Sequence, residues 1–201
     1  RLCRDGEMVV VHDPIIDRVA DGRGRVSRMT LDALREFNFG TEEMPQSVLT
    51  LHELLEMIRP TDKHLYIETK HPSRYGPMVE EQVVRVLQHA GMLDDERIHL
   101  ITFSAAAVVR MKRLAPQVDR FHLRRKYERW ANPIDAHPGQ PTGLGLSLWR
   151  AKRRPDLIGK HGLPTYMWTV NEPEDMLWSR DNGVDLMATD EVSLALEVLG
   201  G

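Results

Sequence analysis

The segment HLYIETK (64–70) is the clearest structural signal in the sequence. Its apolar and aromatic residues are typical of a buried strand, which ends in the charged residues Glu68 and Lys70. Side chains two positions apart in a strand point to the same face, so both charges would lie on one face where the strand ends.

Further short apolar runs follow this segment, and helical patterns separate most of them. The predicted strands are HLYIE (64–68), IHLITF (98–103), DRFHLR (119–124), GLGLSL (143–148), PTYMWTV (164–170) and DLMATD (185–190). The predicted helices run from Pro77 to Gly91, from Ser104 to just before Pro116, from Pro173 to Asp181 and from Glu191 to Leu199. Strict alternation of strands and helices predicts parallel βαβ units in an α/β fold.

The number of units indicates which α/β fold this is. A closed TIM (β/α)₈ barrel has eight βα units and about 250 residues, and the chain shows six units in 201 residues. We therefore expect a TIM barrel without its first one or two units, and we expect the missing part to precede Arg1. An open, doubly wound sheet is the alternative. No glycine-rich phosphate loop follows any strand, which weakens its nucleotide-binding form.

Residues 13–63 interrupt the alternating pattern. They contain a glycine-rich turn, a short helix that starts at Thr30 and a segment in which Thr50 and Glu53 form a predicted capping box. We interpret 13–63 as an insertion beside the barrel, within one domain that covers residues 1–201 and is incomplete at its N-terminus.

Composition limits the classes of partner. A net charge of −3, with basic and acidic residues spread along the chain, gives no electrostatic reason to expect nucleic acid or an anionic membrane as a partner. No apolar run approaches the length needed to span a bilayer, so stable membrane insertion is not expected. The single cysteine, Cys3, excludes an internal disulfide and favours a cytoplasmic location, although a signal peptide upstream of Arg1 would not be visible.

In an α/β barrel the active site lies at the C-terminal ends of the strands. The polar and aromatic residues expected there are His12 with Asp13, Glu68 with Lys70, Phe103, and Trp168 with Asn171. A carboxylate beside an ammonium can hold a metal ion and an anion next to each other. The oxygen ligand suits Mg²⁺ or Ca²⁺, and the lysine suits a phosphate oxygen.

Each of these residues also has a purely structural interpretation. His12 on its own is more typical of a hydrogen-bonding residue at a strand end, and Asp13 before Pro14 is typical of a turn. Glu68 and Lys70 could form a solvated ion pair, and Trp168 could belong to the core. The functional interpretation gains weight because all these positions would lie at the same rim.

Five segments, in order, resemble the glycerophosphodiester phosphodiesterase family. They are DGEMVVVHDPIIDRVADGRGRV, MPQSVLTLHELLEMI, LYIETKHP, PTYMWTVN and NGVDLMATD. The resemblance covers nearly the whole chain. It implies a TIM barrel with a small insertion, and a phosphoric diester hydrolase that converts glycerophosphodiesters to glycerol 3-phosphate and an alcohol, in phospholipid turnover.

The resemblance also implies roles for individual residues. His12 corresponds to one of two histidines for acid–base catalysis, and Glu68 to a carboxylate that binds a divalent cation, Mg²⁺ or Ca²⁺. Lys70 would lie beside the phosphate, and Trp168 would line the glycerol side of the pocket. Phe103 would form part of the pocket wall and influence head-group preference.

Two motifs of the family are absent from this chain. Family members open with His-Arg-Gly and Glu-x-Asp motifs, which supply the second histidine, an arginine and two more metal carboxylates. Two alternatives therefore stay open: a non-catalytic barrel that binds a phosphorylated ligand or a protein partner, and a related phospholipase D-like or phosphoinositide-cleaving phosphodiesterase. The oligomeric state is not predicted by the sequence.

Overall fold

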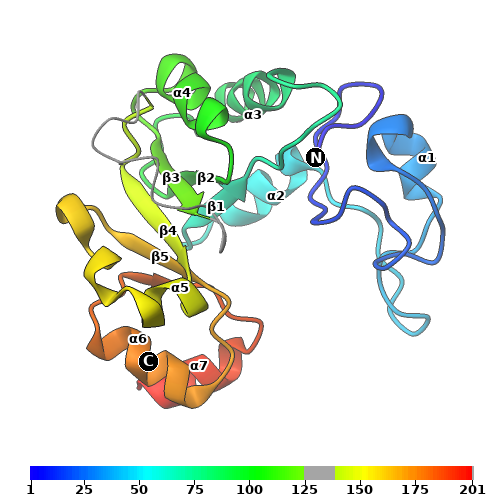
Figure 1. Cartoon of the computed structure of the whole chain (residues 1–201). Coiled ribbons are helices and arrows are strands. Elements are labelled where there is room, and N and C mark those ends of the chain that lie inside the picture. Colours follow the sequence, from blue (N-terminus) through cyan, green and yellow to red (C-terminus); the bar gives the residue numbers. More distant parts are fainter. Residues whose placement is uncertain (125–138, 201) are drawn as a thin grey trace. The chain divides into compact units, whose positions relative to one another are not determined.

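The computed structural model describes residues 1–124 and 139–200, which form strands and helices in alternation (Figure 1). The strands are β1 (Leu65–Glu68), β2 (Ile98–Thr102), β3 (Asp119–Arg124), β4 (Gly143–Ser147), β5 (Thr165–Trp168) and β6 (Leu186–Met187). The α-helices are α1 (Leu31–Arg35), α2 (Leu51–Ile58), α3 (Met78–His89), α4 (Ala105–Leu114), α5 (Leu148–Arg153), α6 (Pro173–Asp181) and α7 (Val192–Leu199). Short 3₁₀ helices are η1 (Val26–Arg28), η3 (Pro155–Leu157) and η4 (Lys160–Gly162). Among the described residues, no helix is long and apolar enough to cross a bilayer.

The strands are hydrogen-bonded in chain order, from β1 to β6. The pairs β3–β4, β4–β5 and β5–β6 are parallel, with Phe121 opposite Gly143, Leu144 opposite Thr165 and Tyr166 opposite Leu186. A doubly wound sheet reverses its strand order at a switch point, and the described strands show no reversal. The α/β class is confirmed, and closure into an eight-stranded barrel stays a prediction.

All six strands lie within the ranges predicted for them. The helix α6 has the predicted limits, and α3, α4 and α7 fall within theirs. The helix α5 was not predicted, because its six residues follow β4 directly and no side chain caps its first turn. The prediction also extended the fourth strand to Leu148, which is the first residue of α5.

The chain divides into two compact units, of which the first comprises residues 1–99 and 113–118. In this unit the segment VVVHDP (9–14) is not a strand. Val9 forms an isolated antiparallel bridge with Thr50, and Met8 forms one with Leu2. The residues 13–63 contribute to a small core of Cys3, Val9, Ile16, Val26, Leu34 and Val48. Their status as an insertion stays a prediction.

Side-chain caps start the helices of this segment. The Thr30 hydroxyl accepts a hydrogen bond from the Ala33 amide at 3.2 Å, at the start of α1. The predicted capping box is confirmed at α2, where the Thr50 hydroxyl accepts from the Glu53 amide and the Glu53 carboxylate accepts from the Thr50 amide. These bonds satisfy amide groups that a helix leaves without internal partners.

The second unit comprises residues 100–112 and 119–201 and contains β3 to β6. Its core includes Leu146, Ala151, Met167, Val170 and Met176, and α6 and α7 lie side by side (Figure 1). The glycine at 143 is required by close approach, since a Cβ atom there would lie 2.2 Å from the Phe121 ring.

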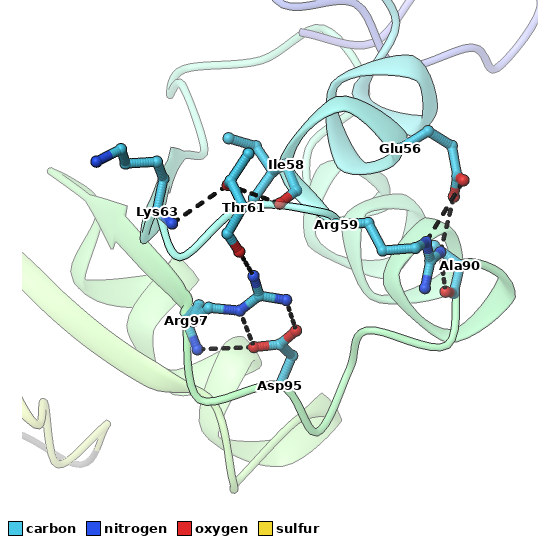
Figure 2. A network of polar contacts seen from close by, with 8 residues as sticks. All are labelled: Glu56, Ile58, Arg59, Thr61, Lys63, Ala90, Asp95 and Arg97. Carbon is cyan, nitrogen blue, oxygen red and sulfur yellow. Dashed lines mark hydrogen bonds and ion pairs between the residues drawn. The ribbon is translucent and has the colours of Figure 1, made fainter.

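Two arginines of the first unit form hydrogen bonds between segments that are distant in the sequence (Figure 2). Arg97, just before β2, donates to the carbonyl of Thr61 and forms a two-bond ion pair with Asp95, at 2.9 and 2.6 Å. Arg59, at the end of α2, donates to Glu56 and to the carbonyl of Ala90, after α3. The hydrogen bonds from Arg97 lower the pKa of Asp95 to about 2.

We predict that Arg97→Gln lowers the melting temperature at pH 7 by about 2 to 4 °C, because it removes the ion pair and the bond to the Thr61 carbonyl. The pKa of Asp95 is depressed in the folded state, so its stabilisation is present above about pH 4 and is lost as pH falls towards 2. Calorimetry from pH 7 to pH 2 should show the difference between the two proteins shrinking in acid, to the part that the bond to the Thr61 carbonyl contributes. Arg85→Gln on α3 is the control, and a constant difference at all pH values would contradict the assignment.

Candidate active site

The end of β1 carries the predicted pair of charges. The Lys70 ammonium donates to the Glu68 carboxylate, with 2.5 Å between Nζ and Oε2, and both side chains are largely buried, 16% and 21% exposed. The two residues do form an ion pair, as the structural interpretation expected, but the pair is largely shielded from water. Charges removed from water are costly unless other groups compensate, so this pair is more typical of a site than of a solvated surface.

The ring of His12 is hydrogen-bonded through one nitrogen, although its side chain is 71% exposed. Its Nδ1 lies 2.7 Å from Oδ1 of Asp13, and the other carboxylate oxygen of Asp13 accepts a hydrogen bond from Nε of Arg18, also at 2.7 Å. These bonds, first from Arg18 and then from His12, lower the pKa of Asp13 to about 2. An ionised carboxylate only accepts hydrogen bonds, so Nδ1 of His12 carries the proton and Nε2 remains for a ligand.

Asp13 therefore does more than form the predicted turn before Pro14. It links His12 to Arg18 through its two oxygens. The sequence gives no signal for Arg18, because an arginine five residues after an aspartate in a loop has no regular geometric relation to it.

The main chain of His12 is also held in place. Arg1 donates from Nε and Nη2 to the carbonyl oxygen of His12, at 3.0 and 2.8 Å. Burial lowers the pKa of Arg1, while the charges of Glu68 and Asp13 oppose that shift. Sequence reasoning did not identify Arg1, which lies outside every motif considered.

His12, Glu68, Lys70 and Arg1 line one hollow of about 290 Å³, which we call the β1 hollow. The rest of its wall is mainly apolar and includes Val9, Val10, Val11, Leu51, Leu54, Tyr66 and Ile67. An imidazole, a carboxylate and two cations within an apolar wall form a setting in which a small anion can be bound and a proton transferred.

The two predicted aromatic residues meet in the second unit. The rings of Phe103 and Trp168 lie edge to face, with centroids 5.2 Å apart and planes at 88°. Gly145 on β4 leaves room for the indole, since a Cβ atom there would lie 2.8 Å from Cζ3 of Trp168. This close approach explains a glycine inside a strand. Whether these rings contact a substrate stays a prediction.

Asn171, also expected at the rim, joins the segments that follow β5 and β6. Its side-chain oxygen accepts from the Thr189 hydroxyl and the Asp190 amide at 3.1 and 2.9 Å, and its Nδ2 donates to the Asp190 carboxylate at 3.0 Å. Both the oxygen and the nitrogen of the amide are thus hydrogen-bonded to described residues, and Asn171 links the segment after β5 to the segment after β6.

The donors present do not form a complete site for a divalent cation. Within residues 1–124 and 139–200, no group of three or more His, Cys, Asp or Glu side chains could hold a metal ion. Mg²⁺ and Ca²⁺ take six or more oxygen ligands, and the β1 hollow offers the single carboxylate of Glu68, which is already paired with Lys70.

We predict that Arg18→Gln raises the pKa of Asp13 from about 2 towards its ordinary value of 3.8, because it removes the largest cause of the depression. The measurement is an NMR titration of the Asp13 carboxyl carbon. Arg23→Gln, in the same exposed loop, is the matched control and should leave the titration unchanged. An unaltered Asp13 titration in Arg18→Gln would show that the bond to Arg18 does not form in solution.

Solved structures share this fold. A phosphodiesterase from Oleispira antarctica, solved in complex with the product sn-glycerol-3-phosphate, is 22% identical and has a TM-score of 0.89, covering 100% of this chain and 82% of that one. A glycerophosphodiester phosphodiesterase from Thermotoga maritima is 20% identical with a TM-score of 0.76, covering 98% and 82%. The fold of these proteins is TIM-barrel-like, in agreement with the predicted fold class.

Sequence comparison identifies the family. The model of the glycerophosphoryl diester phosphodiesterase family matches residues 1–194. A Mycobacterium tuberculosis protein named "Probable glycerophosphodiester phosphodiesterase 1" is 36% identical over 94% of this chain and 76% of its own length. A glycerophosphodiester phosphodiesterase from Caldanaerobacter subterraneus is 27% identical over 95% and 79%. The chain belongs to the glycerophosphoryl diester phosphodiesterase family, which confirms the predicted enzyme class, a phosphoric diester hydrolase.

Proposed function

We propose that the protein hydrolyses glycerophosphodiesters to glycerol 3-phosphate and an alcohol, with the reacting phosphate in the β1 hollow. One observation carries the proposal. In a chain of this family, His12, Glu68 and Lys70 line the same hollow, although His12 lies 56 residues before Glu68 and 58 before Lys70. Its volume of about 290 Å³ suits the small polar part of such a diester.

We assign proton transfer to His12. With Nδ1–H bound to Asp13, a protonated Nε2 can donate its proton to the departing alkoxide. The proton of the attacking water then needs a separate base, and the family resemblance implies a second histidine for that role. Asp13 orients the ring by accepting a hydrogen bond from Nδ1–H, and Arg1 holds the backbone that carries the ring.

We assign phosphate binding to Lys70 and Arg1. Both cations line the β1 hollow, and the mainly apolar wall around them strengthens their attraction for an anion. The ammonium of Lys70 has three donors, of which the bond to Glu68 uses one, so it can contact a phosphate oxygen and keep that partner. Negative charge that develops during hydrolysis would be stabilised by these cations.

Metal dependence is part of the proposal, with Glu68 as one ligand of Mg²⁺ or Ca²⁺. The family resemblance supports it, while the described residues supply too few oxygen ligands. Phe103 and Trp168 are proposed to form an aromatic wall for the substrate, and a cytoplasmic location stays a prediction.

We predict that the purified natural full-length protein releases glycerol 3-phosphate from glycerophosphocholine in the presence of Mg²⁺ or Ca²⁺. His12→Ala should lower kcat by roughly 100-fold or more, because it removes the proton donor. The exposed histidine of α2 provides a matched control, His52→Ala, which should retain wild-type turnover. Circular dichroism checks that both variants are folded.

Two outcomes would redirect the assignment. No product from glycerophosphocholine or other glycerophosphodiesters would favour the non-catalytic barrel or the phospholipase D-like alternative. Unchanged turnover in His12→Ala would mean that His12 is a structural residue of the loop.

We also predict that Glu68→Gln weakens binding of Mg²⁺ or Ca²⁺ by at least about tenfold, because a neutral amide is a much poorer ligand than a carboxylate. Isothermal titration calorimetry on the full-length protein measures this directly, without an activity assay. Glu81→Gln, an exposed position on α3, is the control. Equal affinity in wild type and Glu68→Gln would remove Glu68 from the metal site.

A further inference from the structure

The first unit contains a second, larger hollow with a strongly basic wall. Its volume is about 540 Å³, and the cations that line it are Arg1, Arg25, Arg28, Lys70 and Arg74. No aspartate or glutamate is among the described residues that line it. We call it the basic hollow. Its charge contrasts with the whole chain, whose net charge is −3.

Hydrogen bonds hold the two sides of the basic hollow together. The carbonyl of Ser27, in η1, accepts from the Tyr75 hydroxyl at 2.8 Å and from Nη1 of Arg74 at 3.3 Å. These bonds connect η1 to the loop that follows β1. Val26 and Val79, both buried, provide apolar wall between the cations.

Two of these five cations, Arg25 and Arg28, have no charged partner among the described residues, whereas Lys70 is paired with Glu68. Neither Arg25 nor Arg28 has a side-chain hydrogen bond or ion pair with any residue that the structure describes. Their backbones are nevertheless placed, because Arg25 bridges to Ile15 and the Arg28 amide donates to the Arg25 carbonyl at 2.9 Å.

The cations also act on one another. Burial is the main cause of the lowered pKa of Arg1; the charges of Glu68 and Asp13 oppose it, and the charge of Arg25 adds a smaller contribution in the same direction as burial. Like charges gathered around a concave surface raise the energy of the protein, and a bound anion relieves that repulsion. Guanidinium groups in particular bind phosphate oxygens through paired hydrogen bonds.

The basic hollow adjoins the proposed reaction site. Arg1 and Lys70 line both hollows, so a ligand whose phosphodiester lies beside Lys70 can extend past these two side chains towards Arg25, Arg28 and Arg74. The volume of about 540 Å³ lies in the range of small-molecule sites. A small ligand fits this geometry better than a polyanionic surface, because the charge lines a hollow and the chain has a net negative charge.

We propose that the basic hollow binds a second phosphate, carried by the alcohol part of the substrate, so that the protein prefers glycerophosphodiesters with a phosphorylated head group. This inference rests on the proposed function and specifies its substrate class. It assigns Arg25, Arg28 and Arg74 to head-group recognition, and it leaves proton transfer with His12.

The test uses two substrates that differ by one phosphate, glycerophosphoinositol 4-phosphate and glycerophosphoinositol. We expect the wild-type protein to show kcat/KM about tenfold higher for the phosphorylated diester, since paired guanidinium–phosphate contacts are strong charge-assisted bonds. In the double variant Arg25→Gln/Arg28→Gln, the ratio of the two kcat/KM values should fall to near one. Arg23→Gln, outside the hollow, should keep the wild-type ratio.

Binding is measured separately from turnover. In a His12→Ala background, calorimetry should give about tenfold tighter binding of the phosphorylated diester, and this difference should disappear when Arg25→Gln/Arg28→Gln is added and shrink at high salt. Tighter binding without any hydrolysis by wild type would support the anion site and overturn the proposed reaction. Equal kcat/KM and equal affinity for both diesters, with hydrolysis of each, would overturn this inference alone.

Discussion

The ion pair between Lys70 and Glu68 is the central interaction of the candidate site, because its ammonium belongs to the walls of both hollows of the first unit. It lies at the end of β1, largely out of water, and Lys70 lines both hollows. A buried ion pair stabilises a fold poorly, because desolvation offsets most of its attraction. The pair instead determines where the two charged groups lie. It holds an ammonium and a carboxylate just after the end of β1, in a hollow that a small anion can enter.

Around this pair the charges are unbalanced in one direction. Arg1, Arg25, Arg28 and Arg74 add positive charge, and the described walls of the two hollows contribute a single carboxylate, that of Glu68. The family's reaction concerns a phosphodiester, which is an anion at neutral pH, so an excess of cations is the expected complement. The whole-chain charge gives no indication of this, because acidic residues elsewhere outnumber the basic ones.

His12 shows how hydrogen bonds can orient an exposed residue of a loop. The segment before it forms only isolated bridges, and the ring orientation comes from Asp13, which Arg18 holds ionised. Hydrogen bonds to a charged carboxylate are stronger than those to a neutral acceptor, so Asp13 gives the ring a preferred orientation where no regular secondary structure holds it.

The sequence by itself determined the α/β class, the place of each strand from β1 to β6, the capping box of α2 and the family, because apolar periodicity, caps and ordered motifs are local properties. It also selected His12, Glu68 and Lys70 as residues of one site. Only the tertiary structure decided that these three line the same hollow, that Asp13 orients His12, and that Arg1, Arg25, Arg28 and Arg74 share a basic wall. Those features combine side chains from segments that are distant in the sequence. Their proximity results from packing, and no regular sequence spacing indicates it.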